Sequence, residues 1–323
     1  MNAAGILAAF GKLGALVVGD VCADRWCRYD PSLAEPSRET GIPRVGVVAT
    51  EVTAGAAGTV ANNLAALGVG RVAVLGALGE DGFGWELDRA LRSRNIRTDL
   101  LVRSPLVSTF TYTKLINAAT DVEDLPRVDF VRAQPLPESV DAELTATLQR
   151  VVDDFDVILV SDQAETSAGG VVTPRMRDAL ANLPKIVWVD SRVRMEHFRG
   201  VILKGNREEA EAAAMRACGR KDFPALRAHT RAGLLIVTGG AEGALVIDDS
   251  RETLVRTQPV ENPVDICGAG DSFSAGAAMA LAVTGSPQEA ARFGNLVASI
   301  TIMKKGTGTA SPEELLANAH AGH

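Results

Sequence analysis

The sequence has few cysteines and few histidines. It contains four of each in 323 residues, with no Cys-x-x-Cys pair and no histidine at metal-binding spacing from a cysteine. A structural zinc site or a disulfide framework requires such clusters, so neither is expected. His320 and His323 lie at the C-terminal end, which leaves little for Ser/His/Asp catalysis. We therefore expect free thiols in a reducing, cytoplasmic compartment.

Long apolar runs and basic stretches are also absent. No apolar run reaches the roughly 18 to 20 residues that a membrane-spanning helix needs. The chain has 33 basic and 40 acidic residues and a net charge of −7. This balance disfavours a nucleic-acid or anionic-membrane surface, but it permits a local basic pocket for a phosphorylated ligand. The N-terminal stretch MNAAGILAAFGKLG has no basic first part like that of a signal peptide, so we expect a mature helix there.

Short apolar runs alternate with helical patterns along the chain. The apolar runs occupy residues 15–20, 71–79, 157–162, 185–190, 200–206 and 234–240. Continuous runs of this length are typical of strands that are buried on both faces. Helical patterns lie between them, at residues 59–68, 84–95, 138–155 and 207–217. The alternation predicts an α/β fold with a mostly parallel sheet flanked by helices.

Two segments break this alternation. Residues 25–54 are rich in Pro, Arg and Glu and end in a strand-like pattern, and residues 107–132 alternate like a hairpin. We expect both to form a small β-rich lid over the carboxyl ends of the main sheet, where open α/β folds bind ligands. The alternative is an edge hairpin with a surface loop. We predict one domain over residues 1–323, whose α/β core comprises about 1–24, 55–106 and 133–323.

The stretch DICGAGDSF, residues 265–273, places two glycines and an aspartate at the start of a helical pattern. Glycines let the backbone approach a ligand closely, and the N–H groups of a helix N-terminus attract an anion. A carboxylate at Asp271 would repel a phosphate, but it could accept the proton of a hydroxyl that attacks phosphorus. The alternative role for Asp271 is an ordinary helix cap.

Five motifs in order resemble the ribokinase-like, or PfkB, family of sugar kinases. DICGAGDSF resembles the family's Asp-Thr-x-Gly-Ala-Gly-Asp signature, and AGAAGTVANNLAALG (54–68) resembles its Gly-Gly signature. The other three motifs are GNREE (205–209), TGGAEG (238–243) and FGNLVASITIMKKGT (293–307). The family's fold is ribokinase-like α/β, with a mostly parallel sheet and a small β lid, so the resemblance implies this fold here.

The resemblance implies an ATP-dependent sugar kinase and gives roles to its catalytic residues. Asp271 would be the general base, and the backbone N–H groups of Gly268, Ala269 and Gly270 would form an anion hole for the migrating phosphoryl group. Glu209 would hold Mg²⁺ through water, and Asp265 would be a second residue on the metal side. The residues implied to contact the nucleotide are Asn206, Thr238, Gly240, Gly243 and Asn295.

Some of these residues also suit ordinary structural roles. Taken alone, Glu209 would fit a solvated helix face, Thr238 to Gly240 would fit a turn, and Asn295 would fit a hydrogen-bonded polar residue of the core. The order and spacing of the motifs, and no single residue, favour the functional roles. The sequence leaves open whether a monovalent cation such as K⁺ assists near the final loop.

Within the family, the chain resembles the kinase domain of the bifunctional heptose-phosphate enzymes. The likeness rests on GDVCADRW (19–26), PSRETGIPRV (36–45), TYTKL (111–115), PRVDF (126–130) and VSDQAE (160–165). GDVCADRW would contain the first strand and the sugar-binding acid. The implied substrate-binding residues are Asp24, Gly55, Thr59, Lys114 and Arg127.

The chain departs from these relatives around the expected sugar site. Ala54 replaces a glycine, Thr59 stands where an asparagine is common, and Ile116 stands where an arginine is expected. We therefore predict an altered sugar pocket. Further basic candidates for holding a phosphorylated substrate are Arg25 and Arg38.

Two classes of function remain open at this stage. The first is an ATP-dependent kinase for a hydroxyl of a sugar or sugar phosphate, such as a heptose 7-phosphate, with a nucleoside or vitamin kinase as the alternative within the fold. The second is a non-catalytic sugar or nucleotide sensor. The partners expected for the kinase are ATP, Mg²⁺, the small-molecule acceptor and a second copy of the chain paired through the lid.

Overall fold

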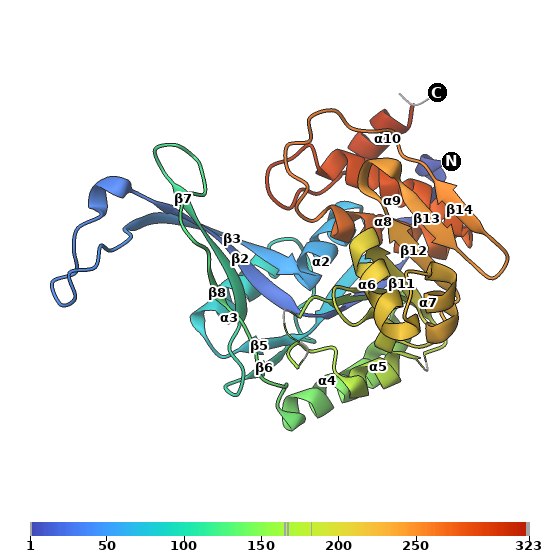
Figure 1. Ribbon diagram of the computed structural model, residues 1–323, viewed down its shortest axis with the longest axis horizontal. Coiled ribbons are helices and arrows are strands. Elements are labelled where there is room, and N and C mark those ends of the chain that lie inside the picture. Colours follow the sequence, from blue (N-terminus) through green and yellow to red (C-terminus); the bar gives the residue numbers. More distant parts are fainter. Residues whose placement is uncertain (1, 165, 167, 182, 321–323) are drawn as a thin grey trace.

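A computed structural model of the chain describes residues 2–164, 166, 168–181 and 183–320 (Figure 1). Glu165 of the VSDQAE motif and His323 therefore lie outside the described residues. The largest sheet has eight strands: β1 (Gly14–Gly19), β4 (Arg71–Leu75), β9 (Val157–Asp162), β10 (Ile186–Ser191), β11 (Ile202–Asn206), β12 (Leu234–Thr238), β13 (Ala244–Ile247) and β14 (Glu252–Val255). Their order is β14-β13-β12-β11-β10-β9-β1-β4.

The main sheet is parallel from β12 to β4, and β13 and β14 add two antiparallel strands at one edge. Its strands are buried on both faces. In β1, Ala15 and Val17 belong to one hydrophobic cluster, while Leu16 and Val18 belong to the other. This alternation explains why the strands read as continuous apolar runs in the sequence. The predicted fold class is confirmed.

Helices cover both faces of the main sheet. The hydrophobic cluster on one face includes side chains of α1 (Ala3–Phe10), α2 (Ala57–Ala66), α3 (Gly82–Arg92), α8 (Ala269–Thr284), α9 (Pro287–Thr301) and α10 (Pro312–His320). The other face packs against α4 (Glu138–Val151), α5 (Pro174–Ala181), α6 (Arg207–Cys218) and α7 (Phe223–Thr230). No helix in the described part of the chain is long and apolar enough to cross a membrane.

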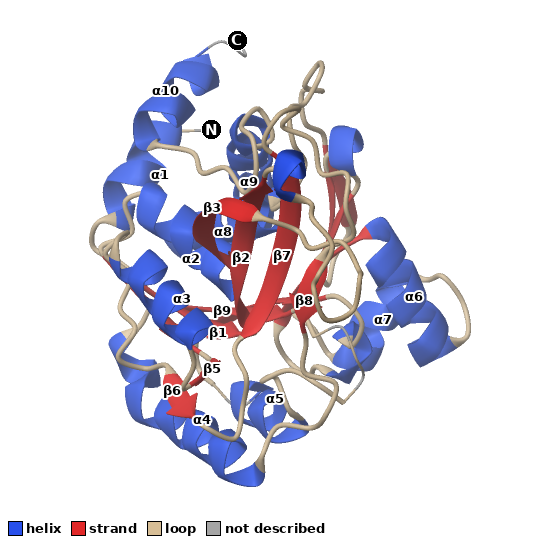
Figure 2. Cartoon of the chain, turned by 90° about the vertical axis from the view of Figure 1, so that its left-hand side faces the viewer, coloured by secondary structure: helices blue, strands red, loops and turns tan. Residues whose placement is uncertain are grey.

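A separate four-stranded sheet stands beside the main one and faces the viewer in Figure 2. Its strands are β2 (Val21–Tyr29), β3 (Val47–Ala56), β7 (Phe110–Asn117) and β8 (Val128–Phe130), in the order β3-β2-β7-β8. We call it the small sheet. Its long connection between β2 and β3 projects away from the rest of the molecule (Figure 1). The sheet contains strands from both segments that were expected to form the lid.

Two predicted boundaries were wrong. The small sheet begins at Val21, so Asp24 lies on its first strand and not on the first strand of the core. The chain leaves the main sheet at Gly19, where a Cβ atom would lie 2.1 Å from the carbonyl oxygen of Ser161. The run at residues 71–79 forms two strands, β4 and β5 (Ala77–Gly79), and β5 pairs with β6 (Val102–Ser104) in a third sheet.

The burial of α2 against the main sheet gives a stability prediction. Leu64 in α2 is fully buried, whereas Leu106 is 62% exposed. Leu64→Ala should lower the free energy of unfolding by about 2 to 5 kcal/mol, because it removes buried apolar atoms and leaves a cavity. Leu106→Ala is the matched control and should change it by less than about 1 kcal/mol. Urea unfolding measures both values, and equal losses would contradict the assigned packing.

Candidate active site

Two cavities meet at the N-terminus of α8. The inner pocket, of about 230 Å³, lies between the small sheet and α8, and the long cavity, of about 520 Å³, extends over the carboxyl ends of β10, β11 and β12. Gln163, Gly268 and Asp271 line both. A ligand in one cavity can therefore reach a ligand in the other beside Asp271. This position matches the usual ligand site of open α/β sheets.

The first turn of α8 presents backbone N–H groups to this junction. Gly268 is the N-cap residue and adopts the left-handed conformation, with φ of 77°. A Cβ atom at Gly270 would lie 2.8 Å from Nζ of Lys204, so glycine permits a close approach there. The N–H of Ala269 donates to the carbonyl oxygen of Ile266 at 3.2 Å. The Ala269 amide is thus engaged inside the turn, which differs from its expected part in an anion hole.

Asp271 lies in the first turn of α8 and does not cap it, because the N-cap position is Gly268. The capping interpretation was therefore wrong. Burial and the neighbouring carboxyl of Asp190 raise the pKa of Asp271 to about 7, although Lys204 and Arg192 oppose the shift. A carboxyl with a pKa near neutrality can take up and release a proton under ordinary conditions.

Lys204 and Asp190 form a buried ion pair beneath this turn. Nζ of Lys204, on β11, lies 2.6 Å from Oδ2 of Asp190, at the end of β10. Burial lowers the pKa of Lys204, but the carboxyls of Asp190, Glu209 and Asp271 together raise it by more, so the pKa lies above its ordinary value. Sequence reasoning missed Lys204. The available signal was a lysine inside an otherwise apolar strand, where a charge needs a partner.

Asn206 and Glu209 form a reciprocal capping box at the start of α6. The N–H of Glu209 donates to Oδ1 of Asn206 at 2.9 Å, and the N–H of Asn206 donates to Oε2 of Glu209 at 2.8 Å. Both residues line the long cavity. Glu209 is half-buried, and burial and the neighbouring Asp190 raise its pKa.

The carboxyl groups around the long cavity suit a divalent cation. Asp190, Glu209 and Asp271 line it together with the single lysine Lys204. Asp190 raises the pKa of each of the other two acids. A cation that keeps most of its water would relieve this repulsion, as Mg²⁺ does at phosphate sites. The described residues contain no cluster of three or more metal-ligating side chains, so binding through water is the arrangement that fits.

The residues expected to contact a nucleotide divide into those that line the long cavity and one, Gly243, that does not. Thr238 and Gly240 line the long cavity. Asn295 also lines it, but its Nδ2 donates to the carbonyl oxygen of Val255 at 3.1 Å, as expected of a hydrogen-bonded core residue. Gly243 is not among the lining residues, and a Cβ there would lie 2.2 Å from the Val255 oxygen. Close packing against the edge strand accounts for this glycine.

Asp265 links two loops. Its Oδ1 accepts a hydrogen bond from the N–H of Cys267 at 2.9 Å, and its Oδ2 accepts one from the N–H of Gly306 at 3.1 Å. The carboxylate therefore fastens the last loop, residues 302–311, to the turn that precedes α8. Both of its oxygens are engaged by backbone groups, which is a different environment from the one expected of a metal ligand.

The inner pocket receives most of the residues expected to bind a sugar. Asp24 and Lys114 line it from the small sheet, and Thr59 lines it from α2. Burial raises the pKa of Asp24 to about 6, while the Cys22 thiol and Lys114 oppose the shift. Gly55 lies behind Asp24. A Cβ at Gly55 would be 2.4 Å from Oδ1 of Asp24, so this glycine leaves room for the carboxylate.

Four basic residues line the inner pocket: Arg25, Lys114, Arg127 and Arg192. Nζ of Lys114 lies 4.3 Å from the ring centroid of Trp26, and the guanidinium of Arg127 lies 4.6 Å from that of Tyr112. Arg38 is exposed in the loop between β2 and β3 and lines no described cavity. Arg192 was not predicted from the sequence. It reaches the pocket because it directly follows the end of β10.

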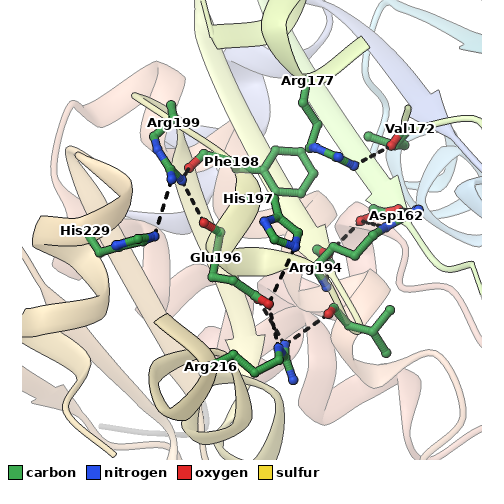
Figure 3. Close-up of polar contacts among 12 residues, drawn as sticks. Asp162, Val172, Arg177, Arg194, Glu196, His197, Phe198, Arg199, Arg216 and His229 are labelled. Atoms are coloured by element: carbon green, nitrogen blue, oxygen red, sulfur yellow. Dashed lines mark hydrogen bonds and ion pairs between the residues drawn. The ribbon is translucent and has the colours of Figure 1, made fainter. Parts of the chain in front are cut away.

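The segment that carries Arg192 is anchored by ion pairs, as Figure 3 shows. Buried Arg194 forms an ion pair with buried Asp162, and its Nη1 donates to the carbonyl oxygen of Gly169 at 2.9 Å. Further along the segment, Nε and Nη2 of Arg216 bind the carboxylate of Glu196 at 2.5 and 2.9 Å. These contacts join the ends of β9 and β10 to α6 and hold the wall of the inner pocket in place.

Comparison with known proteins assigns the family. The chain matches the pfkB family of carbohydrate kinases over residues 15–314. The bifunctional protein HldE of Trichlorobacter lovleyi is 31% identical over 96% of this chain and 64% of that protein. The protein of the same name from Methylococcus capsulatus is 32% identical over 98% of this chain and 66% of that protein. The chain thus spans about two thirds of the length of these relatives.

Solved structures share the fold. Phosphofructokinase-2 of Escherichia coli has a TM-score of 0.73 at 18% identity, covering 96% of this chain and 100% of that one. A ribokinase of Thermotoga maritima has a TM-score of 0.70 at 18% identity, covering 95% and 99%. These structures establish a ribokinase-like fold, and the family match covers nearly the whole chain. The chain therefore belongs to the pfkB family of carbohydrate kinases.

Proposed function

We propose that this kinase transfers the γ-phosphoryl group of ATP to a hydroxyl of a sugar or sugar phosphate held in the inner pocket. The supporting observation is that the inner pocket and the long cavity meet at Asp271 and at the N-terminus of α8. The nucleotide would occupy the long cavity, where Thr238, Gly240 and Asn295 lie. A related solved structure is described as an Arabidopsis thaliana ribokinase complexed with ribose and ATP.

The residues at the junction suit the demands of phosphoryl transfer. Asp271 accepts the proton of the attacking hydroxyl, and its pKa near 7 lets it do so at neutral pH. The amides of Gly268 and Gly270 and the ammonium of Lys204 stabilise charge on the transferred group. Mg²⁺, held through water by Glu209 and Asp190, would neutralise the nucleotide phosphates. Asp24 orients the acceptor through its hydroxyls.

The charges of the inner pocket favour an acceptor that is itself phosphorylated. Its lining has four basic residues and two acidic residues, Asp24 and Asp271, although the whole chain carries a net charge of −7. Guanidinium and ammonium groups are the usual partners of phosphate. A heptose 7-phosphate is the first acceptor to test, since relatives named HldE share about 30% identity. Thr59 and Ile116 then mark the places where this chain differs from that group.

The small sheet offers a surface for pairing two copies of the chain, with the sheet acting as the lid. Exposed apolar side chains gather on it and on its projecting loop, namely Ile42, Val45, Val48, Val128 and Phe130. Apolar patches of this kind are typical of association surfaces.

Light scattering should give the mass of a dimer, and Ile42→Glu combined with Val48→Glu should give that of a monomer. A monomeric mass for the unaltered chain contradicts this part of the proposal.

Asp271→Asn tests the catalytic role. Turnover of ATP with the best acceptor from a panel of sugars, sugar phosphates and nucleosides should fall by about 10² to 10⁴, the usual contribution of a general base. Nucleotide binding, measured by calorimetry, should be retained, because the α8 amides remain. Asp153→Asn, at an exposed acid, is the matched control. Tight binding of ligands without turnover of any of them would support a sensor instead, and preferred turnover of a nucleoside would support a nucleoside kinase.

The pH dependence of activity follows from the same carboxyl. Asp271 must be ionised to act as a base, and its pKa is raised to about 7. The value of kcat/KM should therefore rise with pH and level off above pH 7, with an apparent pKa near 7. A profile measured from pH 5.5 to 9 checks this. A profile that is flat between pH 5.5 and 7.5 would exclude Asp271 as the base.

The raised pKa of Asp271 also predicts a stability cost. Its pKa rises from an ordinary 3.8 to about 7 on folding, so folding is favoured most at low pH, and this contribution is lost as pH rises towards 7. Asp271→Asn should therefore be more stable than the unaltered chain at pH 8, by of order 1 to 3 kcal/mol. The difference should shrink at pH 5. Urea unfolding at both pH values measures it, and a difference independent of pH would refute the assignment.

A further inference from the structure

Trp26 stands at the outer edge of the inner pocket. It lies in the middle of β2, and its side chain is half-buried. It lines both the inner pocket and a further cavity of about 650 Å³ between the small sheet and the last loop. The indole ring therefore stands between the proposed place of the acceptor and the wider space outside it.

Two neighbours surround the indole ring. Lys114 is the direct cross-strand partner of Trp26 on β7, and its Nζ lies 4.3 Å from the ring centroid. This distance is that of a cation–π contact, for which tryptophan is the best of the aromatic side chains. At Gly306 in the last loop, a Cβ atom would lie 3.5 Å from Cζ2 of the ring, so the loop backbone passes close to the indole. The ring thus lies between a strand and the last loop.

The last loop is itself fastened at this point. Nζ of Lys305 lies 2.5 Å from Oδ2 of Asp121, in the hairpin between β7 and β8. The N–H of the next residue, Gly306, donates to Oδ2 of Asp265. The backbone beside the indole is therefore held from two directions, and this limits the positions open to the ring.

Lys114 differs from Arg25 and Arg127, the other two cations that the small sheet and its hairpin bring to the inner pocket. All three lie over an aromatic ring, but the two arginines are also paired with carboxylates. Nε of Arg25 lies 3.2 Å from Oε2 of Glu86, and Nη2 of Arg127 lies 2.6 Å from Oδ2 of Asp129. The ammonium of Lys114 forms no ion pair with any residue in the described ranges. Its charge is therefore the least compensated of the three.

The charge of Lys114 acts inside the inner pocket. Burial raises the pKa of the Asp24 carboxyl and of the Cys267 thiol, and Lys114 opposes both shifts. Both residues line the inner pocket. Glu51, the partner of Trp26 on β3, is exposed and pairs with no cation in the part of the chain that the structure describes. A neutral ring holds a cation without cancelling its charge, which leaves the ammonium for an oxygen of the acceptor.

We propose that Trp26 is a positioning residue for the acceptor: its ring holds the ammonium of Lys114 in the inner pocket, beside Asp24. This inference rests on the proposed function, because it assumes that the acceptor occupies the inner pocket and that Lys114 contacts one of its oxygens. It adds a residue that acts through Lys114 and not on the reacting atoms. The aromatic face of the indole then determines how tightly the acceptor is held.

A double-mutant cycle tests whether Trp26 acts through Lys114. Trp26→Leu should raise KM for the best panel acceptor about tenfold, while kcat and KM for ATP change less than about threefold. Trp26→Phe keeps an aromatic face, so its KM should stay within about threefold of that of the unaltered chain. In the Lys114→Met background the ammonium is gone, and Trp26→Leu should then change KM less than about twofold.

Trp85→Leu is the matched control. Trp85 also carries a cation over its ring, since Cζ of Arg89 lies 5.6 Å from the centroid, but it is 62% exposed and lines no described cavity. Its replacement should leave the acceptor KM unchanged. Equal effects of Trp26→Leu with and without Lys114, or no effect in the unaltered chain, overturn the inference. If Trp26→Leu does not fold, Trp26→Met takes its place, because methionine fills irregular apolar gaps.

NMR measures the contact without ligand or turnover. In a chain whose lysines carry ¹³C-methyl groups, the Lys114 signal should be displaced upfield by the indole ring current, and Trp26→Leu should remove the displacement. Lys114→Met identifies the signal. A Lys114 signal at its ordinary position rejects the inference.

Failure of the proposed function gives a different result. If no acceptor is turned over, the proposed kinase reaction fails, and calorimetry with the panel compounds then decides the role of Trp26. A displaced Lys114 signal, together with binding that weakens about tenfold in Trp26→Leu, supports the inference. Binding that is equally tight without the indole, or the absence of any bound compound, rejects it.

Discussion

The buried ion pair between Lys204 and Asp190 is the interaction on which the site depends. It places a cation and an anion at the adjacent ends of β11 and β10, 2.6 Å apart, directly beneath the first turn of α8. Gly270 has no Cβ, and this allows the helix to lie close to the lysine. The same pair influences the pKa of Asp271 in both directions, because Asp190 raises it and Lys204 lowers it. Removal of either partner would leave an uncompensated buried charge.

The general architecture could be read from the sequence because burial on two faces leaves a clear pattern. The strands β1, β9, β10, β11 and β12 appear as apolar runs, since alternate side chains of each strand enter the two opposite cores. The edge strands β13 and β14 were missed. β13 is a run of only four apolar residues, and β14 alternates between exposed and covered positions, so neither shows an apolar run as long as those of the central strands. The division of residues 71–79 into β4 and β5 at Gly76 could not be seen in the sequence, because the residues on both sides of Gly76 are apolar.

Candidate site residues could be predicted from the sequence where they belong to one continuous motif. Residues that come together only when the chain folds could not. Asp271 and Glu209 were found from short stretches of sequence. Lys204 and Arg192 were not, because their relevance comes from strand ends that meet only in the folded sheet. The capping box of Asn206 and Glu209 was also missed, although an asparagine followed three residues later by a glutamate is a sequence signature of a helix start. The reciprocal bonds of Asn206 and Glu209 give these residues a structural role in addition to any contact with phosphate, so one pair of side chains both begins α6 and lines the cavity.

The last loop connects parts of the molecule that are far apart in the sequence. Lys305 contacts Asp121 in the hairpin of the small sheet, and the next residue, Gly306, donates its N–H to Asp265. Two adjacent residues therefore join the small sheet to the segment just before α8. A rotation of the small sheet away from the core must either break the Lys305 contact or pull on the Asp265 turn. Through these two contacts the last loop ties the small sheet to the start of α8.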